Sequence, residues 1–279
     1  MRYKIIIDSC GELLDEWKKD ECFESIPLTL MVGAEQIIDD ETFNQADFLQ
    51  KVAACPECPK SACPSPERYM RAYDCEAEHI YAVTLSSELS GSYNSAILGK
   101  NLFLEEQPEK KVHVFNSKSA SGGQSLIAMK IVECEEKGLS FEEVVSEVEK
   151  YIEEMNTFFV LENLETLRKN GRLGRVKALV ASALKIKPVM GATDQGVIIQ
   201  LGQARGMQKA LRLMAETITA ELEHPEEKVL GLVHCNNPER AEYVKQELMK
   251  LVKVKDIIVL ESSGVSTLYA AQGGIIIAV

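Results

Sequence analysis

Short apolar runs alternate with stretches of helical periodicity through the first part of the chain. The apolar runs have strand length and are rich in β-branched residues; they cover 3–8, 25–32, 79–85 and 112–115. The helical stretches cover 43–54, 66–74, 91–106, 123–137 and 140–155. Ser140 and Glu143 form a capping box that marks the start of the last helix. Strands that alternate with helices in this way predict βαβ units and a mostly parallel sheet.

The pattern changes near residue 157. A short strand is expected at 158–161, a helix at 162–170, a hairpin over 186–201, helices at 206–222 and 238–250, and strands at 229–234, 255–260 and 274–279. The hairpin predicts antiparallel pairing in this part. We therefore expect an α/β protein of two domains: a mostly parallel N-terminal domain over 1–157 and a mixed α/β C-terminal domain over 158–279.

Size and charge narrow the classes of function. The 279 residues include 31 Lys and Arg against 43 Asp and Glu, a net charge of −12. Such a chain lacks the basic footprint expected for binding a nucleic-acid backbone. No apolar run approaches the roughly 18 residues of a membrane helix, and the three isoleucines at 5–7 are too few for a signal-peptide core. We expect a cytoplasmic protein without stable membrane insertion.

The cysteines offer one candidate metal or redox site. Cys55, Cys58 and Cys63 follow a C-x2-C-x4-C spacing, and the first pair has metal-ligand spacing. A structural zinc site needs a fourth ligand, and no second C-x-x-C follows. Reduced thiols are the simpler interpretation, and the sequence leaves metal binding open.

Three serine-rich loops are the main candidates for ligand binding. They span 61–65, 86–91 and 117–123, and each precedes a predicted helix. In a parallel α/β sheet such loops gather at the carboxyl ends of the strands, where ligands bind. Hydroxyls and free backbone N–H groups there are suited to an anion. The candidate ligand-binding residues in or beside these loops are Ser61, Ser90, Gly91, Ser92 and Ser119.

The alternative is that each serine only caps its helix, and any single loop favours that interpretation. The chain has no G-x-x-x-x-G-K-[ST] motif, and no G-x-G-x-x-G follows the first strand. Ser90 and Ser92 lack the flanking glycines of a G-x-S-x-G elbow. We therefore expect the serines to be ligands for an anion rather than nucleophiles.

A basic stretch interrupts this acidic chain. Residues 166–193 contain no acid and carry seven cations: Arg168, Lys169, Arg172, Arg175, Lys177, Lys185 and Lys187. The stretch predicts an anion contact or a docking patch, or else a solvated helix end whose cations favour the helix dipole. Arg172 stands between Gly171 and Gly174, where a sharp bend is expected, and is the best candidate for the domain interface.

Several segments together resemble the DegV family of bacterial fatty-acid-binding proteins. The most specific are LSSELSGSYNSA at 85–96 and LETLRKNGRLGR at 164–175, continued at 184–189; others lie at 7–9, 61–66, 117–123 and 204–205. The resemblance implies a two-domain α/β protein that holds one long-chain fatty acid between its domains, without another cofactor. It also implies a non-enzymatic carrier that presents the acid to a separate kinase partner for acyl-phosphate formation in phospholipid synthesis.

The resemblance assigns roles to individual residues. The family's carboxylate-binding Thr or Ser of the first loop falls on Ser61, and the Ser of the second loop falls on Ser90. Arg172 corresponds to an arginine near the head group or the kinase contact. The family's Thr-Ser-Gln-Pro is Ser-Ala-Cys-Pro here, at 61–64, and its C-terminal His-x-Gly-Pro-Gly is replaced by YAAQG at 269–273. Tyr269 takes the place of the histidine, which puts the coupling to a kinase in doubt.

Two other functions stay open at this stage. An enzyme acting on a small phosphate or carboxylate substrate is suggested by the loops and by Asp8-Ser9 at the end of the first strand. A sensor is suggested by the cysteine spacing. The sequence indicates neither the acyl chain length or unsaturation nor the oligomeric state.

Overall fold

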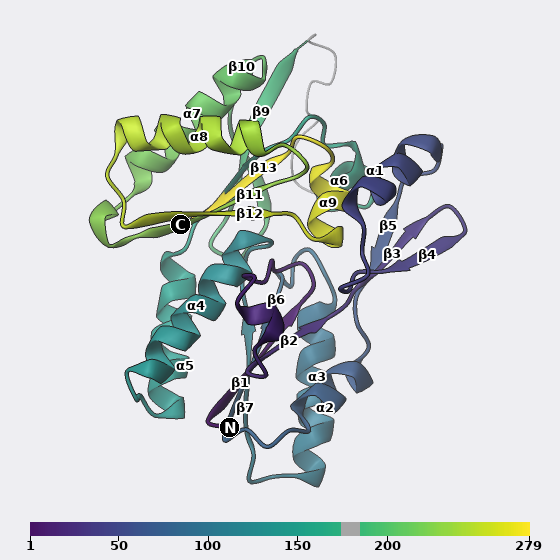
Figure 1. Ribbon diagram of the computed structural model, residues 1–279, viewed down its shortest axis with the longest axis vertical. Coiled ribbons are helices and arrows are strands. Elements are labelled where there is room, and N and C mark those ends of the chain that lie inside the picture. Colours follow the sequence, from purple (N-terminus) through teal and green to yellow (C-terminus); the bar gives the residue numbers. More distant parts are fainter. Residues whose placement is uncertain (174–184) are drawn as a thin grey trace.

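The computed structural model describes residues 1–173 and 185–279 and contains three sheets. The first sheet is parallel, in the order β2-β1-β6-β7, from Phe23–Ile26, Tyr3–Asp8, His79–Thr84 and Lys111–Asn116. Its helices are α2 (Pro66–Tyr73), α3 (Ser92–Glu106), α4 (Gly122–Glu136) and α5 (Phe141–Glu154). Figure 1 shows α4 and α5 on one face of this sheet and α2 and α3 on the other.

Burial on both faces explains the continuous apolar runs of this sheet. Along β1, Ile5 and Ile7 pack into the core on the α4–α5 side, while Ile6 packs into the core on the α2–α3 side. Successive side chains of a strand point to opposite faces, so a strand covered on both faces is apolar throughout. The capping box at Ser140 and Glu143 is present at the start of α5.

The second sheet is mixed, in the order β10-β9-β8-β13-β11-β12. Its strands are β8 (Thr157–Val160), β9 (Ile186–Ala192), β10 (Ile198–Arg205), β11 (Val229–His234), β12 (Asp256–Glu261) and β13 (Ile275–Ala278). Only the β11–β12 pair is parallel among these described strands. The helices α7 (Met207–Glu221) and α8 (Pro238–Leu251) enclose its main core. The α/β class, with one parallel and one mixed sheet, is confirmed.

The third sheet, which the sequence did not predict, is small and antiparallel. Its order is β4-β3-β5, from Glu35–Ile38, Thr29–Val32 and Lys60–Ala62. The predicted strand at 25–32 is therefore wrong: Pro27 and Leu28 separate β2 from β3, because the chain leaves the parallel sheet there. The serine-rich loop expected at 61–65 likewise begins within β5.

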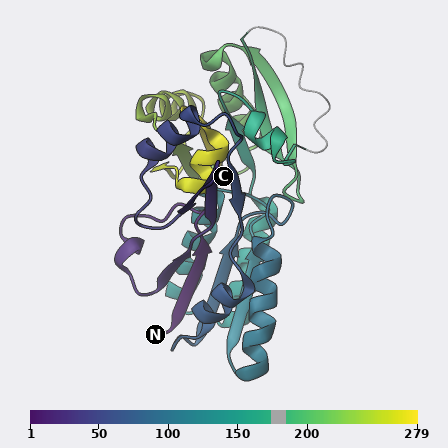
Figure 2. The same ribbon diagram turned by 90° about the vertical axis from the view of Figure 1, so that its right-hand side faces the viewer.

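The remaining helices are α1 (Gln45–Ala54), α6 (Glu165–Lys169) and α9 (Gly264–Ala270), with short 3-10 turns at Trp17–Lys19 and Pro225–Glu227. The sequence analysis missed α9, which is almost wholly buried and so has no amphipathic pattern. Figure 2, like Figure 1, places the parallel sheet at the bottom and the mixed sheet at the top. The amino end of α4 reaches the mixed sheet: a Cβ on Gly122 would lie 3.2 Å from the Gly231 carbonyl oxygen of β11.

Candidate functional site

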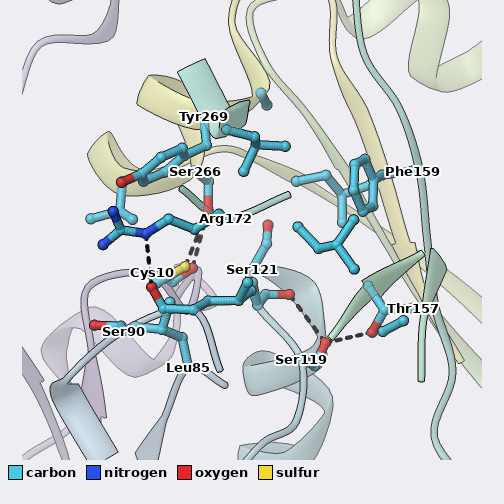
Figure 3. Close-up of a pocket in the computed structure, with 18 of the residues that line it drawn as sticks. Cys10, Leu85, Ser90, Ser119, Ser121, Thr157, Phe159, Arg172, Ser266 and Tyr269 are labelled. Carbon is cyan, nitrogen blue, oxygen red and sulfur yellow. Dashed lines mark hydrogen bonds between the residues drawn. The ribbon is translucent and has the colours of Figure 1, made fainter. Parts of the chain in front are cut away.

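A pocket lies where the loops at the carboxyl edge of the parallel sheet meet the mixed sheet and α9. It encloses about 820 Å³ of empty space, a volume that includes the open solvent at its mouth. Most of its wall is apolar, and the large apolar side chains come from both parts of the chain: Leu28, Leu85, Leu89, Phe159, Leu161, Leu167, Ile198, Val265 and Ile276. Figure 3 shows the pocket from one side.

Polar groups from three distant segments meet at one end of this pocket. The Ser61 hydroxyl on β5 lies 3.1 Å from the Tyr269 hydroxyl on α9. The Arg172 guanidinium lies 6.0 Å from the centre of the Tyr269 ring, and its Nε donates to the Leu89 carbonyl oxygen at 3.1 Å. Leu89 precedes Ser90, so Ser61, Ser90, Arg172 and Tyr269 all line the same end.

Local backbone structure directs Arg172 to this place. The helix α6 ends at Lys169, and Gly171 has a positive φ of 77°. That conformation is easily reached only by glycine, and it lets the Arg172 N–H return to the Leu167 carbonyl oxygen at 2.8 Å. The chain thus reverses after α6 and turns the arginine side chain to the pocket wall.

The charge of Arg172 has no counterion among the described residues. Its hydrogen bonds go to the backbone carbonyl oxygens of Leu89 and Asn170, and none of the ion pairs found outside 174–184 includes it. A guanidinium carries five N–H donors and a fixed positive charge. This end of the pocket is therefore suited to an anion.

The other wall hydroxyls are already engaged. Ser119 and Thr157 pair with each other at 2.6 Å, and Ser266 donates to the Cys10 carbonyl oxygen at 3.2 Å. Ser121 donates to both carboxylate oxygens of Glu12, at 3.0 and 2.9 Å. Figure 3 places Ser119 and Thr157 across the pocket from Ser90 and Arg172. Ser119 therefore lies on the pocket wall, as expected, but away from the anionic end.

Two expected ligand-binding residues lie outside the lining of the pocket. Ser92 is fully buried at the start of α3 and contacts Ser90, with 3.1 Å between the two hydroxyl oxygens. Gly91 lies against Cys63, whose Sγ would be 3.0 Å from an added Cβ. The first turn of a helix presents only part of its residues to a cleft. Gly91 and Ser92 therefore lie next to Ser90 without facing the pocket.

The sequence is similar to a known protein family along almost its whole length. The model of the DegV family of uncharacterised proteins matches residues 2–279. The chain belongs to the DegV family. A DegV domain-containing protein of Streptococcus pneumoniae is 34% identical over 278 residues, which cover 99% of this chain and 98% of that protein.

Solved structures of DegV proteins share the whole fold. A DegV family protein from Ruminococcus gnavus with vaccenic acid is 54% identical, with a TM-score of 0.98 and coverage of 100% of this chain and 99% of that one. The Streptococcus pneumoniae Fatty Acid Kinase (Fak) B3 protein loaded with linoleic acid is 34% identical, with a TM-score of 0.88 and coverage of 100% and 99%. A Eubacterium eligens DegV protein loaded with heptadecanoic acid is 27% identical, with a TM-score of 0.89 and coverage of 99% and 98%.

Three buried carboxyl groups support the pocket of this DegV protein from behind. Asp8 accepts from the Leu85 N–H at 2.9 Å, and Asp39 accepts from the Val265 N–H at 2.9 Å. Glu12 is held by Ser121. Burial raises the pKa of Asp8 and of Asp39 to about 6 and the pKa of Glu12 to about 7. Within the described ranges no Lys, Arg or His forms an ion pair with any of the three.

The sequence analysis did not single out Glu12 or Asp39, because an isolated acid in a loop carries no local signal of burial. The sequence suggests an enzyme site at Asp8 and Ser9, at the end of the first strand. Both are buried, at 0% and 3% exposure, and neither lines the pocket, so the structure does not support that role.

Because these three carboxyl groups have raised pKa values, we expect the free energy of unfolding to fall as pH rises. Each has a folded-state pKa above its usual value near 4, so the folded protein keeps protons that the unfolded chain releases. The stabilisation is complete below about pH 4 and is lost through about pH 7. Burial lowers the pKa of His234, which opposes this trend, but His234 is one group against three.

Urea unfolding should give a free energy of unfolding on the order of a few kcal/mol lower at pH 8 than at pH 5.5. Glu12→Gln should flatten the slope and the exposed Glu153→Gln should not; a free energy that rises with pH would contradict this expectation.

The rest of the basic stretch does not gather at the pocket. Arg168 pairs with Glu165 at 2.9 Å, and Lys187 pairs with Glu162 at 2.7 Å. Arg175 and Lys177 lie outside the described residues. The sensor hypothesis gains no support: the cysteines are free thiols, and no group of three or more potential metal ligands is found in 1–173 and 185–279. Within those ranges no helix is long and apolar enough to span a membrane.

Proposed function

We propose that this protein binds one long-chain fatty acid in the pocket, with the carboxylate at the end formed by Ser61, Ser90, Arg172 and Tyr269. The acyl chain runs past Phe159 toward Ser119 and Thr157. The observation that carries the proposal is the guanidinium of Arg172, which has no acidic partner among the described residues and stands at one end of a mostly apolar pocket. The fatty acids named for the related structures support the same ligand class.

The energetics favour such a ligand. A buried methylene contributes about 0.8 kcal/mol, so a sixteen-carbon chain contributes on the order of 12 kcal/mol before the entropic costs of binding. A buried carboxylate without partners would oppose this strongly. A wall whose hydroxyls are engaged elsewhere, with one cationic end, meets both requirements.

The protein acts as a carrier rather than as an enzyme in this proposal. It presents the acid in the cytoplasm to a separate kinase, which forms the acyl-phosphate. The name of the Streptococcus pneumoniae relative, a Fatty Acid Kinase (Fak) B3 protein, supports the partner class. We also propose that the ligand joins two domains, 1–157 and 158–279, since pocket residues come from both ranges.

The test is organic extraction of the purified, denatured protein followed by mass spectrometry. A C14–C18 fatty acid at a stoichiometry near one per chain supports the proposal. No retained acid, even after incubation of the folded protein with palmitate, would refute it.

Removing the Ser90 hydroxyl should weaken binding modestly. Ser90 lines the polar end, and one hydrogen bond contributes about 0.5–1.5 kcal/mol, so Ser90→Ala should raise the Kd for palmitate about 2- to 10-fold. Ser87→Ala is the control, because Ser87 belongs to the same loop but not to the pocket lining. Equal Kd values for both variants and the wild type would exclude Ser90 from the head-group site.

A further inference from the structure

The turn between β9 and β10 lies against loops of the parallel sheet at the end of the pocket near Ser119 and Thr157, which we call the tail end. The Ser86 hydroxyl donates to the Gly196 carbonyl oxygen at 3.0 Å, between residues 110 positions apart in sequence. A Cβ on Gly196 would lie 2.7 Å from the Lys118 carbonyl oxygen. The Ser86 N–H donates to the Ser119 carbonyl oxygen at 2.7 Å. The turn is thus held directly beside the Ser119 loop.

The hydrogen bonds of this turn fix how Gly196 approaches the loops. The Gly196 N–H donates to the Thr193 carbonyl oxygen at 2.7 Å, and the Thr193 N–H donates to the Val197 carbonyl oxygen at 2.9 Å. Gly196 has a φ of 79°, a conformation that commonly ends a three-residue hairpin loop and that glycine adopts without strain. Gly196 is buried, although Asp194 and Gln195 just before it are exposed. Its burial therefore comes from the contact with the loops.

This contact is part of the pocket wall. Gly196 and Ile198 line the pocket on the hairpin side, and Lys118 and Ser119 line it on the loop side. Ser86 is fully buried beside them. An added Cβ on Gly196 would meet the Ser86 hydroxyl and would lie 2.8 Å from Lys118 Cα, whereas two carbon atoms in favourable contact are about 3.5–4.0 Å apart. The hairpin and the loop can touch here because residue 196 has no side chain.

The position of the contact bears on the length of the acyl chain. The proposed head-group end is at Arg172, so each added methylene extends the tail toward the tail end. A methylene gains free energy only where it leaves water and finds space. Beyond the length at which the tail meets Gly196 and Lys118, further methylenes add no burial unless the turn moves away from the loop.

We propose that Gly196 is a specificity-determining residue of the fatty-acid site: its close contact with Ser86 and Lys118 closes the wall at the tail end and sets the upper limit of the acyl chain length. This inference rests on the proposed function. The limit acts on the tail alone, so the recognition of the carboxylate is the same for acids on either side of it.

Competition between two acids tests this limit. The delipidated protein is equilibrated with equal concentrations of palmitate and arachidate, which is four carbons longer. The folded protein is recovered by gel filtration, and the bound acids are counted by mass spectrometry after extraction. The wild type should retain arachidate no better than palmitate. Gly196→Ala, whose methyl group moves the turn away from Lys118, should raise the bound ratio of arachidate to palmitate about 10-fold, the gain from burying roughly two more methylenes.

The ratio of two acids separates the tail end from the head-group end. The Ser86 carbonyl oxygen accepts the Ser90 N–H at 3.1 Å, so a shift of Ser86 can also reach the head-group loop. Palmitate and arachidate share one head group, and such an effect changes the binding of both by the same factor. It therefore cancels in the ratio.

Two control variants isolate the contact. Gly138 has a φ of 78°, and no described atom lies within 4 Å of a Cβ placed there, so Gly138→Ala introduces the same backbone strain without a contact and should keep the wild-type ratio. Ser86→Ala removes the hydrogen bond to the turn without adding an atom and should also raise the ratio. Ser87→Ala is its control, because the Ser87 hydroxyl accepts from the Asn116 side chain at 2.8 Å instead.

An unchanged ratio in Gly196→Ala overturns the inference alone. A lower ratio also overturns it, because the methyl group then fills the pocket instead of opening it. So does an equal rise in Gly138→Ala, or a wild type that already prefers arachidate by more than about 10-fold. If Gly196→Ala does not fold, Ser86→Ala against Ser87→Ala decides in the same way. Failure of the wild type to bind either acid refutes the proposed function itself.

Discussion

Replacing Arg172 by alanine should weaken fatty-acid binding about 10- to 100-fold. The guanidinium stands at the polar end of the pocket without a described acidic partner, so a bound carboxylate gains a charge-assisted hydrogen bond of about 1.5–3 kcal/mol there. The loss should be similar for acids of every chain length, because all share the same head group. Displacement of a fluorescent fatty acid measures the Kd for each acid.

Arg168 provides a matched control for this experiment. It lies four residues earlier, carries the same charge, is 60% exposed and is paired with Glu165. Arg168→Ala should leave the Kd within about 2-fold of the wild type, because an exposed ion pair contributes little. Equal effects of the two substitutions would mean that only the general charge of the stretch matters, which would contradict the placement of the carboxylate at Arg172.

Replacing Ala192 by phenylalanine should weaken the binding of long-chain acids more than that of shorter ones. Ala192 lines the pocket at the end of β9, and a phenyl group there takes the space of three or four methylenes. At about 0.8 kcal/mol per methylene, the affinity for palmitate should fall about 50- to 200-fold. Laurate, which is four carbons shorter, should lose much less. The ratio of the two Kd values is therefore the informative measurement.

Asp194→Phe is the control for Ala192→Phe. Asp194 is exposed in the turn that follows and is not part of the lining, so neither acid should be affected. If Ala192→Phe weakens laurate and palmitate by the same factor, the acyl chain does not pass this wall, and the direction proposed for the tail is wrong.

Much of the fold follows from local patterns. The buried runs at 3–8 and 79–85 predict parallel strands because both faces of that sheet are covered, and β1 and β6 are those strands. The third sheet does not follow, because β3 and β5 each have only a few residues and pair although 27 residues of sequence lie between them. Such pairing depends on tertiary contacts rather than on propensity.

The candidate site is predictable by residue type but not by position. Ser61, Ser90 and Ser119 all line the pocket, yet only the first two lie at the end with Arg172. A serine loop at a strand end looks the same in sequence wherever it faces. Tyr269 meets Ser61 across 208 residues of sequence, and α9 carries it in a helix too buried to show a periodicity. The supporting acids at 8, 12 and 39 became recognisable only through their buried hydrogen bonds.

The orientation of the bound acid is tested most directly by crystallising the protein with 16-bromohexadecanoic acid and locating the bromine by its anomalous scattering. The account predicts the carboxylate beside Arg172 and Ser61, with the bromine at the far wall near Phe159, Thr157 and Ser119. A bromine beside Arg172, or one outside the pocket, would contradict it.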